Sequence, residues 1–459
     1  MSKTFDRFLV LLAVLGILIA VMTIVAMATR PAGVVAADSG STTDAAGAPA
    51  VQTTTARIEL TEWGIEGDLA VPPGPVDFVV HNSGTVLHNF EIVGVGVSPD
   101  VSSGRDITWS VNLPAGSYEV VCNIPGHKEA GMRATLTVAE GATPAPSGSH
   151  GGHGADADWE ALDDAMMQSI MAFPAETEGK GNLPLDYELV DGVKVFELTT
   201  EITPWEVEPG RFVDAWTYNG MVPGPMIKVD VGDQVRVILH NKLPGGTDIH
   251  WHGISTPFNM DGVAPLTQPL VKSGETFVYE FEARRMSIGM YHAHTHGQVA
   301  VPNGLFGAFI VGELPLPAGR TIGGLEVPED LEIAQEIPMV LNDAGVIGFS
   351  LNGKSFPATE PYVVTEGDWL LVHYYNEGMQ VHPMHQHQFP QLVFAKDGIP
   401  LDHPYWADTV NVAPGERYSV LMNPNEVGAW VWHCHILNHV EREEGMFGMV
   451  TALIVQEAA

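Results

Sequence analysis

The stretch Trp432–Met446, WHCHILNHVEREEGM, places one of the chain's two cysteines between two histidines. In a β-strand, residues two apart point to the same face of the sheet, and the residue between them points to the other face. His433 and His435 therefore present two imidazoles to one face, while Cys434 presents its thiol to the opposite face. The stretch predicts a strand that carries ligand-type side chains on both faces.

Two kinds of segment each occur three times along the chain. The first kind is an alternating strand that ends at an asparagine and leads through a loop to histidine: VDFVVHNSGTVLHNF (76–90), GDQVRVILHNKLPGGTDIHWHG (232–253) and GDWLLVHYYNEGMQVHPMHQH (367–387). The second kind is a glycine turn, an alternating aromatic strand and a cluster of ligand-type residues: PAGSYEVVCNIPGH (114–127), MSIGMYHAHTHGQ (286–298) and EVGAWVWHCHILNH (426–439). Alternation of period two indicates strands, and a repeated unit indicates homologous domains. The sequence therefore predicts an all-β protein with three β-sandwich domains, at 56–139, 186–318 and 319–459.

The N-terminus has the pattern of an export signal. Lys3 and Arg7 precede an apolar run at 8–28, which is just long enough to span a bilayer. We expect residues 1–30 to form an apolar helix that is retained as a membrane anchor. The alternative is a signal peptide that is cleaved at VVAA (34–37). The body of the protein would then lie outside the cytoplasm.

Two polar segments are predicted to be linkers. Residues 31–55 read as a flexible tether. Residues 140–185 begin as low-complexity linker and then include a short helix, whose common face holds Trp159, Leu162, Met166 and Ile170.

The charge of the chain limits its partners. The formal net charge is −35, and a nucleic-acid partner is not expected because phosphate binding needs a basic footprint. An acidic surface would attract cations or a basic redox partner instead, and a solvated acidic surface with no such partner explains the charge equally well.

Two of the repeats carry the ligands of a blue-copper site. The first repeat holds His88, Cys122, His127 and Met132. Two imidazoles, one thiolate and a thioether suit electron transfer by copper, because soft sulfur favours Cu(I) and imidazole accommodates Cu(II). The third repeat matches three of these positions with His382, Cys434 and His439. We therefore predict a type 1 copper site in each of these two repeats.

The second and third repeats also hold four His-x-His pairs. They are His250 with His252, His292 with His294, His385 with His387, and His433 with His435. Ala293 and Thr247 stand where the third repeat has Cys434 and His382, so the second repeat lacks a type 1 site. Eight imidazoles are enough to hold three copper ions at the junction of two such domains. Cys434 would join that cluster covalently to the type 1 copper.

These motifs resemble those of the multicopper oxidases. The chain resembles their two-domain, small-laccase branch with a plastocyanin-like cupredoxin fused at the N-terminus, and the resemblance spans about residues 56–459. It implies three cupredoxin-type Greek-key domains. It also implies type 1 ligands at His382, Cys434, His439 and Met446, type 2 ligands at His250 and His385, and type 3 ligands at His252, His292, His294, His387, His433 and His435.

The resemblance leaves two residue roles open. The family's axial position, five residues after the second type 1 histidine, is Glu444 here, so Met446 is the expected ligand and Met449 is expected in the core. Asp261, nine residues after His252, corresponds to an acid near the type 2 copper, which either delivers protons or makes structural hydrogen bonds. The family further implies a ring-shaped homotrimer, with each three-copper cluster formed between the second repeat of one subunit and the third repeat of the next.

The implied activity is one-electron oxidation of a phenol, an aromatic amine or a metal ion, coupled to four-electron reduction of dioxygen to water. The N-terminal cupredoxin would relay electrons from an external redox protein or dock one. A copper nitrite reductase is the nearest alternative, but that family keeps its type 1 cysteine where this chain has Ala293 and binds its type 2 copper with three histidines. A non-catalytic copper electron-transfer protein would leave the eight paired histidines without a joint role.

Overall fold

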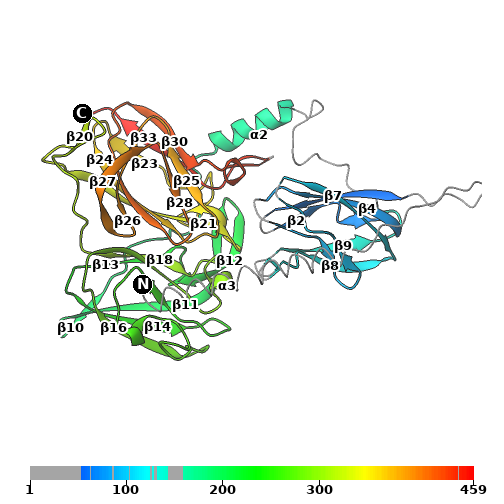
Figure 1. Cartoon of the computed structure of the whole chain (residues 1–459), viewed down its shortest axis with the longest axis horizontal. Helices are drawn as coiled ribbons and strands as arrows, with labels where there is room; N and C mark the ends of the chain where they lie inside the picture. Colours follow the sequence, from blue (N-terminus) through cyan, green and yellow to red (C-terminus); the bar gives the residue numbers. More distant parts are fainter. Residues whose placement is uncertain are drawn as a thin grey trace, which may run out of the picture. The chain divides into compact units, whose positions relative to one another are not determined.

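The computed structural model describes most of the chain outside its N-terminus (Figure 1). The described residues are 53–61, 64–84, 87–102, 104–124, 127–128, 132–142, 159–442 and 444–458. The predicted apolar helix at 1–30 and nearly all of the linker at 31–55 lie outside these ranges. Within them, no helix has the length and apolar character needed to cross a membrane.

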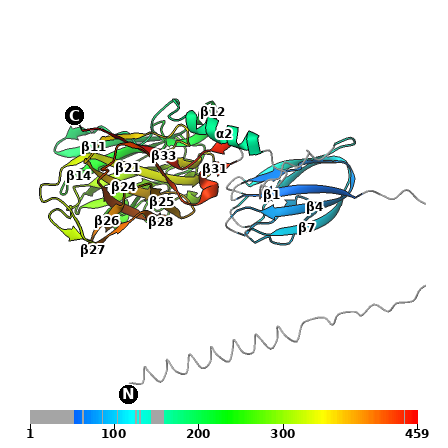
Figure 2. The ribbon, with the colours of Figure 1, turned by 90° about the horizontal axis from the view of Figure 1, so that it is seen from above.

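The first domain is a sandwich of two sheets (Figure 2). One sheet has the order β2 (Ile65–Gly67), β1 (Thr54–Leu60), β4 (Gly74–Asn82) and β7 (Asp106–Leu113). The other sheet has the order β3 (Ala70–Val71), β9 (Arg133–Val138), β8 (Gly116–Val121), β5 (Glu91–Ile92) and β6 (Gly96–Val97). Every second residue of β4 from Val76 onward is buried, so one face of the strand fills the core. Phe78 and Phe90 pack there beside Cys122 and Met132. Burial of each phenylalanine contributes about 1.5–3 kcal/mol.

The second domain has the same construction. Its first sheet runs β10 (Glu188–Val190), β11 (Val193–Glu208), β14 (Gln234–Asn241) and β16 (Thr276–Glu282), and β12 (Arg211–Tyr218) pairs with β11. Its second sheet runs β13 (Gly224–Val229), β18 (Phe306–Val311), β17 (Ser287–His292) and β15 (His250–His252). Trp251 points into the core between the sheets, where it contacts Tyr279 and Phe309.

The third domain has the largest sheets. One runs β22 (Gly348–Leu351), β21 (Ile333–Ala344), β24 (Trp369–Asn376), β29 (Arg417–Met422), β26 (Gln391–Lys396) and β27 (Ile399–Ala407). The other runs β23 (Tyr362–Thr365), β33 (Val450–Gln456), β30 (Gly428–Cys434), β25 (His382–Gln386) and β28 (Thr409–Val412). Trp432 is fully buried between them, and its indole N–H donates to the hydroxyl of Tyr374.

A buried asparagine ends the equivalent strand in each domain. The amides of Asn82, Asn241 and Asn376 donate to the main-chain oxygens of Val101, Val271 and Val412, respectively. Each side-chain oxygen accepts an N–H from the residue two positions later. A buried polar side chain is retained where its hydrogen bonds are satisfied. The asparagine thus fixes the loop that leads to the first histidines of each repeat.

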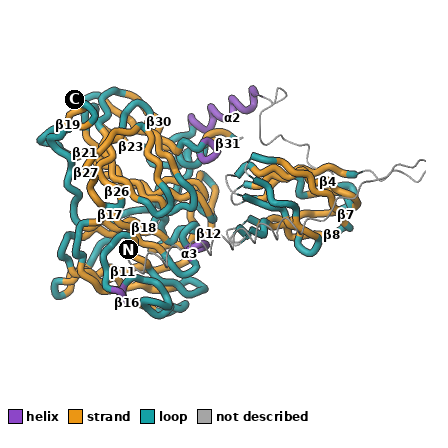
Figure 3. The backbone as a smooth tube through the Cα atoms, viewed as in Figure 1, coloured by secondary structure: helices purple, strands orange, loops and turns teal. Residues whose placement is uncertain are grey.

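Helices are few among the described residues (Figure 3). The longest is α2 (Trp159–Met171), in the segment where the sequence predicts a short helix. It contacts a hairpin in the third domain formed by β31 (Glu441–Arg442) and β32 (Gly445–Met446). The remaining ones are α3 (Gly297–Ala300) and two 3₁₀ turns, η1 (Phe258–Met260) and η2 (Leu437–His439). The prediction of an all-β chain is confirmed.

Candidate copper sites

The first domain brings the predicted type 1 residues together. Cys122 directly follows β8, and its Sγ lies 3.4 Å from Nδ1 of His127 and 3.9 Å from Nδ1 of His88. The two Nδ1 atoms are 3.0 Å apart. Three donor atoms from distant parts of the sequence therefore converge on one point.

Burial shifts the pKa values of the imidazole and thiol groups at this site. Burial lowers the pKa of His88 to about 4, with a further contribution from the neighbouring His127. Burial also raises the pKa of the Cys122 thiol. A neutral imidazole can donate its lone pair to a metal ion, whereas the thiol becomes a ligand only when the metal ion displaces its proton.

The third domain repeats this arrangement in a fully buried setting. Cys434 Sγ lies 3.7 Å from Nδ1 of His382 and 3.6 Å from Nδ1 of His439. Burial raises the pKa of the thiol to about 12 and lowers the pKa of His439 to about 3. The donor set fits copper for the same reason as in the first domain.

Asp343, which the sequence did not single out, orients one of these histidines. Its Oδ2 lies 2.9 Å from Nε2 of His382, and both side chains are fully buried. The carboxylate also accepts the N–H groups of Met379 and Gln380. A carboxylate at Nε2 holds the proton there, so Nδ1 is left as a bare lone pair facing Cys434.

The axial methionine of the third domain is best identified by comparison with the first. In the first domain the N–H of Cys122 donates to the carbonyl of Met132, and the N–H of Met132 donates to the carbonyl of His127. Met132 lies one residue before β9 and is fully buried. These contacts close the ligand loop.

Met449 makes the same contacts in the third domain. The N–H of Cys434 donates to the carbonyl of Met449, and the N–H of Met449 donates to the carbonyl of His439, each at 3.0 Å. Met449 lies one residue before β33 and is fully buried. Met446, the residue that the sequence favoured, lies instead in the inserted hairpin, and its N–H donates to Oγ of Ser169 in α2. The position equivalent to Met132 is therefore Met449.

The second domain gathers its two histidine pairs at one end of a sheet. Strand β15 pairs with β17 so that His250 lies opposite His292. The ring centroid of His250 lies 5.5 Å from that of His292 and 5.8 Å from that of His294. The ring centroids of His252 and His292 are 5.6 Å apart. Burial lowers the pKa of His252 to about 3 and that of His292 to about 4, so both rings are neutral.

The third domain gathers the other two pairs in the same way. His385 lies opposite His433 where β25 pairs with β30. Their centroids are 5.6 Å apart, and His385 lies 5.6 Å from His435. Nε2 of His387 lies 3.2 Å from Nε2 of His433. Cys434 points to the opposite face, into the core, as the opening stretch predicts.

Hydrogen bonds to main-chain oxygens set which nitrogen these rings present. Nδ1 of His250, His292, His385 and His433 lies 2.8–3.0 Å from the carbonyls of Asp261, Ala293, Asp408 and Cys434, respectively. Because a carbonyl only accepts, each Nδ1 carries the proton and each Nε2 is free to bind a metal ion. The histidines beside Cys122 and Cys434 present Nδ1 to the thiol instead, so the two kinds of cluster expose different ring nitrogens.

The eight histidines form two separate quartets within one chain. Among the described residues, each ring contact between them joins members of the same domain. One quartet is His250, His252, His292 and His294, and the other is His385, His387, His433 and His435. Among the described residues, the two quartets are therefore separate clusters of imidazoles.

Comparison with known proteins agrees with this arrangement. Two family models described as "Multicopper oxidase" match residues 200–315 and 326–457, and a model described as "Sulfocyanin (SoxE) domain" matches 73–146. The chain belongs to the multicopper oxidase family. It also carries an N-terminal cupredoxin-like domain.

Individual relatives support the same family. Laccase-1 of Cryptococcus neoformans (strain B-3501A) is 28% identical over 277 residues, which cover 52% of this chain and 44% of the relative. The "Probable nitrite reductase-hydroxylamine oxidoreductase fusion protein" of Kuenenia stuttgartiensis is 28% identical over 283 residues, which cover 56% of this chain and 31% of the relative. The crystal structure of a blue copper oxidase from Nitrosomonas europaea superposes with a TM-score of 0.52 at 31% identity, covering 57% of this chain and 85% of that one. The chain thus spans less than half the length of these curated relatives.

Two aspartates of this multicopper oxidase make hydrogen bonds to the histidine segments of the second domain. The carbonyl of Asp261 is the partner of His250, while its partly exposed carboxylate lies 3.7 Å from the same Nδ1. Asp248, which the sequence did not single out, is fully buried and accepts the N–H groups of His294 and Thr295, each at 2.8 Å. Asp261 is therefore in contact with the site, and Asp248 shapes the second histidine loop.

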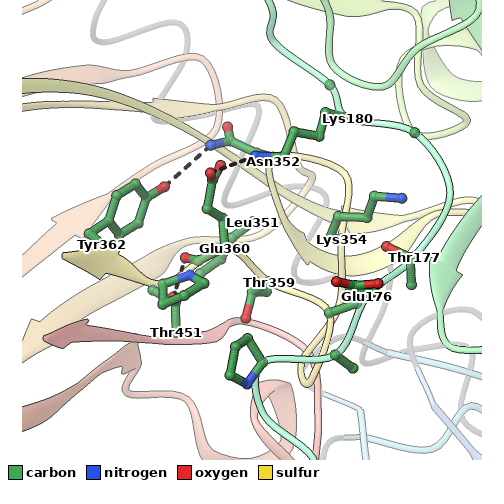
Figure 4. A pocket seen from close by; sticks show the side chains of 16 residues that line it. Glu176, Thr177, Lys180, Leu351, Asn352, Lys354, Thr359, Glu360, Tyr362 and Thr451 are labelled. Atoms are coloured by element: carbon green, nitrogen blue, oxygen red, sulfur yellow. Dashed lines mark hydrogen bonds and ion pairs between the residues drawn. The ribbon is translucent and has the colours of Figure 1, made fainter.

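A cavity of about 340 Å³ is lined by residues within 174–181 and 351–362 and by Thr451 (Figure 4). Both lysines that line it are paired. Lys180 contacts Glu360 at 2.7 Å, and Nζ of Lys354 donates to the carbonyls of Glu178 and Glu206. Its lining residues include no histidine or cysteine. They come from the segment after α2 and from the third domain, so the cavity lies between these two parts of the chain.

Proposed function

We propose that this chain is a laccase-like oxidase. It would take electrons one at a time from a phenol, an aromatic amine or a metal ion, and use four electrons and four protons to reduce dioxygen to two waters. The family membership supports copper-dependent oxidoreductase chemistry, since multicopper oxidases couple a reducing substrate to dioxygen. When bound, copper would supply the redox chemistry, and the protein supplies position, geometry and proton access.

The observation that carries the proposal is the two-faced strand β30. Cys434 faces the core beside His382 and His439, while His433 and His435 belong to the histidine quartet on the other side. An electron that enters at the cysteine has a covalent path through one residue's backbone to either neighbouring imidazole. A simple electron-transfer protein has no use for the second face.

We assign the ligands as follows. The type 1 site of the third domain uses His382, Cys434, His439 and Met449, and that of the first domain uses His88, Cys122, His127 and Met132. His250 and His385 would hold the type 2 copper, and His252, His292, His294, His387, His433 and His435 the type 3 pair. The three-copper cluster would form from half-sites of neighbouring subunits in a homotrimer, because the two quartets of one chain do not touch among the described residues.

Oxygen uptake by the copper-loaded protein tests the proposal. With a generic one-electron donor and no nitrite, we expect one dioxygen to be consumed per four donor electrons, without release of peroxide. Cys434→Ser should retain the quartet histidines but abolish uptake. A wild-type protein that has a bleachable blue band and consumes no dioxygen would contradict the proposal.

Nitrite reduction is the second candidate function, because one relative carries nitrite reductase in its name. The structure's eight histidines in two quartets, with Ala293 at the cysteine position of the second repeat, favour dioxygen. Nitric oxide formation from nitrite under anaerobic conditions, at a rate above that of oxygen uptake in air, would reverse this order.

We further propose that the protein acts outside the cytoplasm and is held there by residues 1–30. The first domain would then pass electrons from an external redox protein to the third domain. Fractionation of cells before and after removal of residues 1–30 tests the location. Deletion of residues 56–139 tests the relay, since it should slow oxidation of a protein donor and spare oxidation of a small phenol.

A further inference from the structure

Glu377 is a buried acid in the loop that follows β24. This residue directly follows Asn376 in the sequence and is only 6% exposed. Ser83 and Lys242 hold the same place after the equivalent asparagines of the other two repeats, and both are exposed. The repeat itself therefore does not require a buried residue at this position.

Glu377 shares a cavity with two histidines of the second domain. The cavity has a volume of about 260 Å³, and His252 and His292 line it together with Glu377, Met379 and the segment 297–302. Oε1 of Glu377 is fully buried and has no hydrogen-bond partner among the described residues. A buried oxygen left without a partner costs about 1–3 kcal/mol, and the exposed residues at the equivalent positions do not incur this cost.

The surroundings of Glu377 favour a neutral carboxyl group. Burial raises its pKa well above the usual range, and the attraction of Arg417 opposes this effect only in part. Arg417 is shared, because its Nη1 lies 3.4 Å from Oδ1 of Asp397 and donates to the carbonyl of Gly415. The other titratable groups that face Glu377 are Tyr218 and Tyr291, with His252 and His292 across the cavity.

We propose that Glu377 donates protons to dioxygen as it is reduced on the side of the cluster held by His252 and His292. The inference rests on the proposed oxidase function, because reduction of dioxygen is what consumes protons there. In each transfer the O–H bond of the carboxyl breaks, and the proton forms an O–H bond with oxygen that has gained electrons from the reducing substrate. The carboxylate then regains a proton from water in the cavity. Asp261 contacts His250 instead, so the two acids serve different histidines.

Glu377→Gln tests the proposal, because it keeps the size of the side chain and removes its acidic proton. The copper-loaded variant should keep the copper content and blue absorption of the wild type, and the donor should reduce its type 1 copper at an unchanged rate without oxygen. Oxygen uptake should fall about a hundredfold, as expected on loss of a general acid. Glu377→Asp, which retains an ionisable group, should restore part of the uptake.

Asp397→Asn is the matched control. It removes a carboxylate from the same arginine, but Asp397 lines a different cavity, with Gly253, Arg285 and Ser287. We expect its oxygen uptake to stay within about twofold of the wild type, since no proton donor is lost. An equal loss in both variants would show that Arg417 electrostatics, and not the proton, matter.

A second readout needs neither copper nor activity. A buried carboxyl with a raised pKa contributes stability below the usual glutamate pKa and loses that contribution as the pH rises through its folded value. Copper-free wild type should therefore lose thermal stability relative to Glu377→Gln as the pH rises, and the infrared band of a protonated carboxylic acid should be absent from the variant.

The outcomes are distinguishable. Unchanged oxygen uptake in Glu377→Gln would overturn the inference alone. Loss of copper or of the blue band in that variant would assign Glu377 a structural role and also overturn it. A wild type that consumes no dioxygen would overturn the proposed function, and the inference with it.

Discussion

Met449 and Met446 lie three residues apart, yet their backbones have different partners. Met449 closes the ligand loop onto Cys434 and His439, whereas Met446 is bonded to α2. We expect Met449→Leu to raise the reduction potential of the type 1 copper and shift its blue absorption, because Cu(II) loses its thioether. Stability should change by less than about 1.5 kcal/mol, because the two side chains have similar volumes. Met446→Leu is the control, and a larger spectral shift in that variant would return the axial role to Met446.

The Asp343–His382 pair is the other residue-scale determinant of this site. Asp343→Asn keeps the shape of the side chain but weakens its hold on Nε2 of His382. Loss of such a partner typically lowers metal affinity 10–100-fold, which competition with a copper chelator would measure. Asp106→Asn is the control, because Asp106 contacts His81, a surface histidine outside the ligand sets. Equal affinities in the two variants would refute the positioning role.

At the scale of elements, α2 and the hairpin β31–β32 form a cover beside the ligand loop. Gly445 has φ +106°, and a Cβ there would lie 2.5 Å from Oγ of Ser169 and 2.7 Å from the carbonyl of Ala165. Gly445→Ala should separate α2 from the hairpin, at a cost of about 1–3 kcal/mol. Faster proteolysis within 159–171 would report the separation. Gly324→Ala is the control, because Gly324 also has a positive φ (+84°) but open space around it.

The same hairpin shows what the sequence could and could not predict. Period-two alternation and the recurring asparagine located the strands, and the first histidine of each pair lies on a paired strand as expected, since both signals are local. The sequence favoured Met446 as the axial ligand, because counting along the chain cannot show that Glu441–Arg442 and Gly445–Met446 pair as a hairpin against α2. Asp343 and Asp248 were missed because each meets its histidine segment only through tertiary contacts, at sequence separations of 39 and 46 residues.

At the scale of the whole molecule, Glu336 links the second and third domains. Its carboxylate contacts Nζ of Lys228 at 2.8 Å and Nε2 of His373 at 3.2 Å. The hydrogen bond from His373, aided by Lys228, lowers the pKa of Glu336 to about 2. A depressed pKa contributes stability above the usual glutamate value, and this is lost as the pH falls through the folded value. Wild type should therefore lose stability relative to Glu336→Gln between about pH 4.5 and pH 2, which thermal unfolding of both proteins across this range would measure.

The separation of the two quartets makes a prediction about assembly. One variant would lose the second-domain half-site (His292→Ala with His294→Ala), and the other would lose the third-domain half-site (His385→Ala with His387→Ala). Neither should consume dioxygen alone. If clusters form across a head-to-tail ring interface, co-refolding the two in equal amounts should restore about a quarter of the wild-type uptake, because about a quarter of interfaces then pair two intact halves. If each chain completed its own cluster, every chain in the mixture would still carry one broken half, and the co-refolded sample would stay inactive.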